Sequence, residues 1–204
     1  MKLKIQALNI TTVTSEPFQH LLITPERILE LFREKDENLN KHTFIEAPGL
    51  KAFFFVNRKI EIVFEAIRML VTDKSGREIH QSDLLNYYEN LLKTFVPKER
   101  ISAYGFNYDL ISEYEKEIEF TQLIGAQLKE IIKNIKESGV RVKFSEDGLL
   151  YDFQILPTNL KNALLYHFNV HFPKSEIPSK EELKKEFLLG FQKLQFLIEK
   201  IKIV

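Results

Sequence analysis

The sequence predicts an α+β protein: a two-layer fold with a mainly antiparallel sheet and about four principal helices, built as a tandem duplication of a strand-helix-strands-helix unit. Three observations predict it. Several segments alternate apolar and polar residues with the period of two that is typical of strands. Other segments carry apolar residues at the spacing of amphipathic helices. The same order of elements then returns about 95 to 98 residues further along the chain.

The first half opens with a strand and a helix. Residues 3–14 alternate, and a change of phase near residues 8–10 indicates a bulge or a twist. Thr24 is the expected N-cap of a helix because its hydroxyl can accept from a free backbone N–H. Pro25 suits the first turn of that helix, where a missing donor costs nothing. We expect the helix to end near residues 38–40.

More strands and a second helix complete this half. Residues 42–46 and 50–56 are expected to be short strands, and residues 59–72 one long strand. The end of the long strand, residues 66–71, is largely apolar on both faces, which predicts that it is covered on both sides. A helix with one apolar stripe follows over residues 82–95.

The second half repeats this order. Its elements are a strand, the clearest helix of the chain, a hairpin, a further strand and a long last helix. The last helix starts with a capping box, in which Ser179 and Glu182 each accept from the other's backbone N–H. We expect these elements at residues 101–112, 119–137, 140–145 with 149–156, 162–172 and 180–200.

These matching orders divide the chain into two α+β halves, residues 1–98 and 99–204. Coincidence is the alternative, because this element order is common and the halves show no convincing residue identity. No low-complexity segment or long linker separates the halves, so we expect them to form one continuous unit.

Composition narrows the chemistry open to the chain. It has no cysteine, which excludes disulfides, thiolate catalysis and cysteine-based metal sites. The 29 basic and 29 acidic residues balance, so no net field favours DNA, RNA or an anionic membrane. No run approaches the ~18–20 apolar residues that cross a bilayer. We therefore expect a cytoplasmic protein without a membrane partner.

Standard catalytic and cofactor motifs are absent. The sequence has no phosphate-binding glycine loop, dinucleotide fingerprint, zinc-protease pattern or nucleophile elbow. On a strand, the spacing of His167 and His171 separates them by ~13 Å, too far to share a metal. The acidic run within residues 113–119 could ligate a hard cation, but it is better explained as a solvated strand end and the acidic start of a helix. We assign no catalytic residue, metal site or cofactor.

The strands of the second half indicate a polar sheet face. Their apolar rows, such as Tyr104, Phe106 and Tyr108, are expected to face the helices. The alternate positions would then form one open, hydrogen-bonding surface that includes two histidines. An ordinary solvated face is the alternative. The candidate binding face consists of Asn107, Asp109, Arg141, Lys143, Asp152, Gln154, His167, Asn169 and His171.

Two segments are apolar on opposite sides. Residues 52–56 are apolar throughout, so one side is core and the other is covered by the second half or by another chain. The last helix has a main stripe that includes Phe187 and a second stripe almost opposite, at ~100° per residue. Self-association and burial between the halves both explain the second stripe. This candidate association face consists of Leu189, Lys193, Phe196 and Lys200.

These observations favour a non-enzymatic module that binds a protein or peptide, or that assembles with a second copy of itself. Binding would use the polar sheet face or the association face. In this hypothesis the mechanism is surface complementarity and burial rather than bond-making.

Two other hypotheses stay open. An enzyme or small-ligand-binding protein requires four side chains to converge in a pocket. They are Asp109, Asp152, His167 and His171. An RNA- or DNA-binding protein requires Arg141 and Lys143 to join further basic residues in one stripe. The candidates are Lys51, Arg58 and Arg68.

Overall fold

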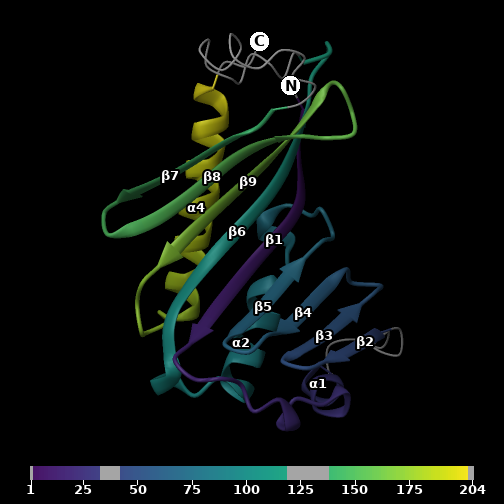
Figure 1. Ribbon diagram of the computed structural model, residues 1–204, viewed down its shortest axis with the longest axis vertical. Helices are drawn as coiled ribbons and strands as arrows, with labels where there is room; N and C mark the ends of the chain where they lie inside the picture. The colour runs from purple at the N-terminus through teal and green to yellow at the C-terminus, as the bar shows by residue number, and fades with distance from the viewer. Residues whose placement is uncertain (1, 33–41, 119–137, 202–204) are drawn as a thin grey trace.

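Two long strands lie side by side at the centre of the molecule (Figure 1). β1 (Lys2–Thr14) and β6 (Ile101–Glu113) pair antiparallel along their whole length, with Asn9 opposite Asn107. The sheet therefore crosses from the first half of the chain to the second without a break. The computed structural model describes residues 2–32, 42–118 and 138–201.

Seven further strands of the described chain extend the sheet on both sides of this pair. Neighbouring strands are antiparallel throughout, in the order β2-β3-β4-β5-β1-β6-β9-β8-β7. The first half thus adds four strands beyond β1, and the second half adds three beyond β6. Their bounds are β2 (His42–Ala47), β3 (Leu50–Phe55), β4 (Ile60–Phe64), β5 (Arg68–Asp73), β7 (Val140–Glu146), β8 (Leu149–Pro157) and β9 (Ala163–Phe172).

The α-helices of the described residues pack on one face of the sheet; in Figure 1, α2 and α4 lie behind the strands and α1 lies at the lower end of the sheet. α1 (Pro25–Phe32) and α2 (Leu84–Phe95) pack on the first half, and α4 (Lys180–Lys200) packs on the second. We call this side the covered face and the other side the open face. Three short 3-10 helices connect elements: His20–Leu22, Ile79–Gln81 and Lys98–Arg100.

Aromatic rings fill the space between α4 and the strands. The ring of Phe187 on α4 lies 5.1 Å, centroid to centroid, from both Phe106 and Tyr108. The predicted inward row of Tyr104, Phe106 and Tyr108 is buried, with no exposed surface on any of the three. Such edge-to-face and offset contacts add to the gain from burying apolar area, so this row anchors α4 to the sheet.

A glycine lets α4 approach the sheet this closely. Tyr108 donates its hydroxyl to the carbonyl oxygen of Phe187 at 2.7 Å. A Cβ at Gly190 would lie 2.5 Å from that same hydroxyl oxygen, closer than real side chains allow. Because Gly190 has no Cβ, the ring of Tyr108 can pass beneath the helix and reach its backbone.

The predicted fold class is wrong in its balance of elements. The described residues form a single nine-stranded antiparallel sheet with three α-helices, where about four principal helices in a duplicated two-layer unit were expected. The helix predicted for residues 119–137 lies outside the described residues. The described strands of both halves of the chain join one continuous sheet. The first half contributes β1 to β5 and the second half contributes β6 to β9, so the two halves differ in strand number. The division at residues 98 and 99 stays a prediction.

The long strand predicted for residues 59–72 is also wrong. It is two strands, β4 and β5, joined by a tight turn in which the Glu65 N–H donates to the Arg68 carbonyl at 2.8 Å. An ion pair between the same two side chains, at 2.6 Å, closes the turn. Ile67 is consequently 42% exposed, and not covered on both sides. The bulge predicted near residues 8–10 lies at Gln6, which the pairing with β6 skips.

Candidate functional site on the open face

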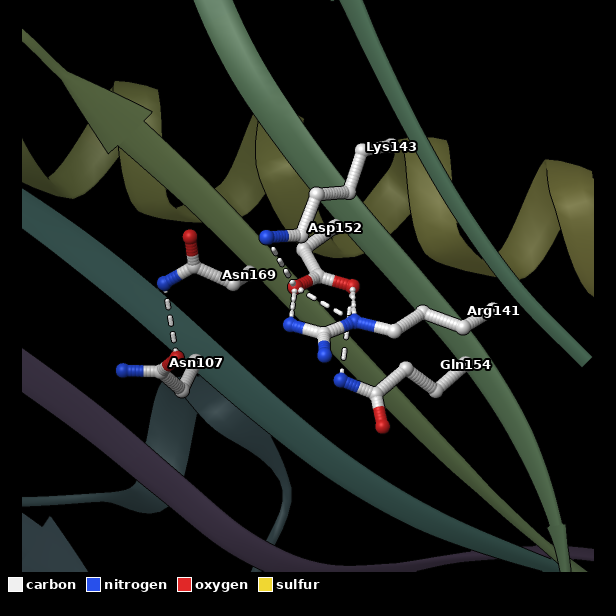
Figure 2. A network of polar contacts seen from close by, with 6 residues as sticks. All are labelled: Asn107, Arg141, Lys143, Asp152, Gln154 and Asn169. Atoms are coloured by element: carbon white, nitrogen blue, oxygen red, sulfur yellow. Dashed lines mark hydrogen bonds and ion pairs between the residues drawn. The ribbon is translucent and has the colours of Figure 1, made fainter.

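The open face carries the nine polar residues of the candidate binding face. Side chains alternate across a strand, so burial of Tyr108 and Phe168 turns their neighbours Asn107 and Asn169 toward the open face. Figure 2 shows six of the nine in front of the strands, with α4 behind the sheet. Those on the edge strand β7 are exposed, and those on the inner strands are half-buried.

Three asparagines and a threonine form a hydrogen-bonded row across four strands, which we call the amide row. Asn169 on β9 donates to Asn107 on β6 at 2.7 Å, between Nδ2 and Oδ1. Asn107 donates in the same way to Asn9 on β1 at 2.7 Å, and Asn9 donates to the hydroxyl of Thr72 on β5 at 2.8 Å. The four residues face one another in register, so the pairing of the strands itself orients the amides.

The amide row keeps hydrogen-bonding capacity that its own contacts do not use. A carboxamide has two N–H donors and one oxygen acceptor. Asn9 and Asn107 each donate one of their two side-chain N–H groups within the row. The side-chain oxygen of Asn169 accepts from no side chain in the described part of the protein. Donors and an acceptor with fixed orientation therefore line the open face.

A charged cluster continues the face at its β7 edge (Figure 2). Asp152 on β8 accepts from the Arg141 guanidinium, with Nε to carboxylate distances of 3.0 and 3.1 Å and a further contact through the terminal nitrogen. Gln154 donates to the same carboxylate at 3.3 Å, and the Lys143 ammonium lies 3.9 Å away. Hydrogen bonding from Arg141 lowers the pKa of Asp152, and the bond to Asp152 raises the pKa of Arg141.

Of the four side chains that an enzyme would need to bring together, only two are in contact. His167 Nδ1 lies 2.6 Å from Asp109 Oδ1, and the pair is about one third exposed. Asp152 is engaged by Arg141, while His171 lies one row further along the sheet, opposite Gly105 and Leu150. Among the described residues, the convergence in a pocket that the enzyme hypothesis requires is therefore not met by these four side chains.

Over β2 to β5 the open face carries several apolar side chains beside the polar Thr43, Glu61 and Thr72. Ala52, Val63 and Leu70 stand opposite one another in register on three adjacent strands. The described strands of the second half lie beside this region in the same sheet and do not cover it, contrary to one of the two expectations for residues 52–56. We call these residues the apolar patch: Ile45, Ala52, Phe54, Val63 and Leu70.

The basic residues that a nucleic-acid site would need lie apart. Lys51 is buried on the covered face, where its ammonium donates to the carbonyl of Ile23 at 2.9 Å. Arg58 pairs with Asp83 at 3.3 Å, and Arg68 sits in the β4–β5 turn. They form no stripe with the basic residues of β7, so the geometric condition for nucleic-acid binding is not met.

The residues of the candidate association face do not all point the same way: some project into solvent, and Lys193 turns toward the sheet. Leu189 and Phe196 project from α4 with 63% and 55% of their surface exposed. Lys200 lies with its ammonium 5.5 Å from the centre of the Phe196 ring. Lys193 turns back to the sheet, where it pairs with Glu146 and its ammonium lies 4.3 Å from the centre of the Tyr151 ring.

Two hollows on the covered side were not expected from the sequence. The larger, about 710 Å³, lies between α2 and the start of α4 and is lined by Leu85, Leu92 and Ile177 among others. The other, about 540 Å³, lies beside α4 next to Leu189. Neither contains a residue of the candidate binding face. Both form where distant segments meet, which residue spacing does not report.

Asn9 and Thr72 are the site residues that the sequence did not reveal. The strand pattern of the second half alone defined the candidate binding face, whereas the amide row continues into the first half. A signal was present: Asn9 interrupts the apolar run between Leu8 and Ile10, and it is only 8% exposed. A buried asparagine requires hydrogen-bond partners, and these come from the neighbouring strands.

Comparison with models of known protein families and with curated proteins finds no match to this chain. Within the described ranges, no group of three or more histidine and acidic side chains is arranged to hold a metal ion. Across the same ranges, no helix combines the length and apolar character needed to cross a membrane.

Proposed function

We propose that the chain is a non-enzymatic binding module that recognises a segment of polypeptide on the open face of its sheet. The observation that carries the proposal is the amide row, a hydrogen-bonded chain of side chains in register across four strands. Because strand pairing and mutual hydrogen bonds already hold these amides, a partner that binds them costs little side-chain entropy.

The chemistry of the face favours a polypeptide over a charged ligand. Carboxamides offer the same donor and acceptor as a peptide group, so an extended chain can complete the bonds that the row leaves open. The charged groups nearby already have partners on the face: Arg141 pairs with Asp152, and Asp109 Oδ1 lies 2.6 Å from His167 Nδ1. The apolar patch on the same face offers a place for apolar side chains of the partner.

The two other hypotheses have less support. The His167–Asp109 contact could orient an imidazole for acid–base chemistry, but no described hollow encloses the pair. Of the basic residues that a nucleic-acid site would combine, Arg141 and Lys143 both lie next to Asp152, and Lys51, Arg58 and Arg68 lie apart from them. The cytoplasmic location expected from the cysteine-free sequence is part of the proposal.

Binding to an array of short synthetic peptides of varied sequence tests it. We expect wild type to bind a subset of the peptides, and the double variant Asn107→Ala/Asn169→Ala to bind the same peptides roughly ten- to thirtyfold more weakly. That change corresponds to about 1 kcal/mol for each of two hydrogen bonds.

Lys184→Ala, an exposed change on α4 away from the open face, is the matched control and should bind as wild type does. Circular dichroism must show that the double variant remains folded. Equal binding by wild type and the double variant, or no peptide bound by wild type at all, would remove the proposal.

A further inference from the structure

The outward side of α4 carries a row of five residues that we call the outer stripe: Lys185, Leu189, Gln192, Phe196 and Glu199. At ~100° per residue, Leu189, Gln192 and Phe196 project within ~60° of one another. The buried residues Leu194 and Phe187 lie on the opposite side of the helix. The outer stripe therefore points directly away from the core.

Apolar exposure on this stripe is concentrated at two positions seven residues apart. Leu189 is 63% exposed and Phe196 is 55% exposed. Single exposed apolar residues are ordinary on protein surfaces. Here two large ones share a helix face at the spacing of two turns, and a hollow of about 540 Å³ opens beside Leu189. This arrangement supplies both a projecting group and a recess on one surface.

We propose that α4 pairs with α4 of a second copy of this chain, antiparallel, about a two-fold axis that passes next to Gln192. In this register Gln192 faces its own copy, and Leu189 lies within one residue, about 1.5 Å along the helix axis, of the level of Phe196 of the second copy, in two equivalent contacts. A two-fold interface requires such self-complementarity, because each contact must occur twice.

The charges select the antiparallel orientation. With the axis at Gln192, Lys185 of each copy stands opposite Glu199 of the other, so both ends of the stripe carry an attractive pair. A parallel pair would instead set Lys185 against Lys185 and Glu199 against Glu199. The apolar pairing and the charge pairing thus agree on the register to within one residue, and that agreement favours a second copy as the occupant.

The hollow beside Leu189 receives the Phe196 ring in this arrangement. Its walls include the apolar side chains of Leu149, Tyr151 and Phe172, and the stem of Lys193 borders it. A ring placed against Leu189 from the second copy can enter this recess and lose its exposed surface. A single helix pair buries less area than a permanent dimer, so we expect a reversible, concentration-dependent dimer.

Cysteine cross-linking tests the register cleanly because the chain has no cysteine of its own. We expect Gln192→Cys to form covalent dimers on oxidation or with a short bis-maleimide, since the two sulfurs meet at the axis. The matched variant Lys185→Cys should not cross-link to itself, because its copies lie at opposite ends of the stripe. Efficient self-linking through Lys185→Cys would mean a parallel pair and would overturn the proposal.

Sedimentation of the untagged protein over a range of concentrations supplies the second measurement. Wild type should move from monomer toward dimer as concentration rises, and Phe196→Asp should stay monomeric at least tenfold further up that range. Lys185→Glu should weaken the dimer, and Lys185→Glu/Glu199→Lys should restore it.

Two further outcomes of these measurements contradict the proposal. One is a wild type that is monomeric throughout. The other is a dimer that Gln192→Cys fails to trap, which would place the contact on another surface. Thermal unfolding of each variant separates lost association from lost folding. Neither outcome depends on peptide binding by the open face, so this inference and the proposed function fail separately.

Discussion

The covered face and the open face belong to the same nine-stranded sheet, yet different forces hold their side chains. On the covered face, the rings of Phe106, Tyr108 and Phe187 pack with at most 2% of their surface exposed, and even one added methyl group has no room at Gly190. On the open face, side chains lie half in water and are held by hydrogen bonds and ion pairs along rows of paired residues. The comparison teaches that one sheet can hold its two sides differently, by burial of aromatic rings on the covered face and by side-chain hydrogen bonds and ion pairs on the open face.

Removing a buried side chain of α4 should have the largest effect on stability. Leu194→Ala deletes a fully buried side chain and should lower the free energy of unfolding by about 2–5 kcal/mol. Leu189→Ala makes the same chemical change five residues earlier on the exposed side and should change it by less than about 0.5 kcal/mol. Urea unfolding monitored by circular dichroism, at low protein concentration, measures both. Similar losses for the two variants would contradict the assignment of the two sides of α4.

Adding a methyl group at the closest contact should have the next largest effect. Gly190→Ala forces its Cβ against the Tyr108 hydroxyl and should cost about 1–3 kcal/mol of unfolding free energy. Tyr108→Phe removes that hydroxyl and alone should cost about 1 kcal/mol, through the lost bond to Phe187. The double variant should be more stable than the sum of the two losses predicts. Strict additivity in this cycle would show that the hydroxyl is not what excludes the methyl group.

The smallest effect is expected on the open face, from pH. Bonding to Arg141 lowers the pKa of Asp152 in the folded state relative to the unfolded chain. The stabilisation from this carboxylate is therefore complete above its ordinary pKa of 3.8 and is lost as pH falls through the lower folded value. Wild type should be slightly more stable than Asp152→Asn at pH 7, and the difference should vanish in strong acid. Urea midpoints across this range measure it, and a difference that grows toward low pH would contradict the ion pair.

The sequence was sufficient to distinguish the two faces in the second half. Period-two alternation placed Tyr104, Phe106 and Tyr108 under the helices and their polar neighbours opposite, because a strand sends successive side chains to opposite sides. The start of α4 also followed from local chemistry, since the Ser179 and Glu182 capping box is formed as expected. Both inferences depend only on residues close together in the chain.

The features that could not be predicted depend on distant residues. The amide row depends on the register of β1 against β6 and β5, which no local pattern specifies. The sequence alone therefore did not indicate that Asn9 and Thr72 belong to the row. The β4–β5 turn lacks glycine and proline, and an ion pair from Arg68 to Glu65 closes it instead. The burial of Lys51 could not be predicted either, because the backbone carbonyl that its ammonium contacts, that of Ile23, lies far away in sequence.

Because β1 pairs with β6 along its whole length, the two halves of the chain are joined by one continuous ladder of backbone hydrogen bonds. If the chain were cleaved between residues 98 and 99, each fragment would expose the unpaired edge of a strand 13 residues long. The best complement for either edge is the other fragment, with its matching length and register. Two separately produced pieces should therefore reassemble on mixing, and either piece kept alone should aggregate through its open edge.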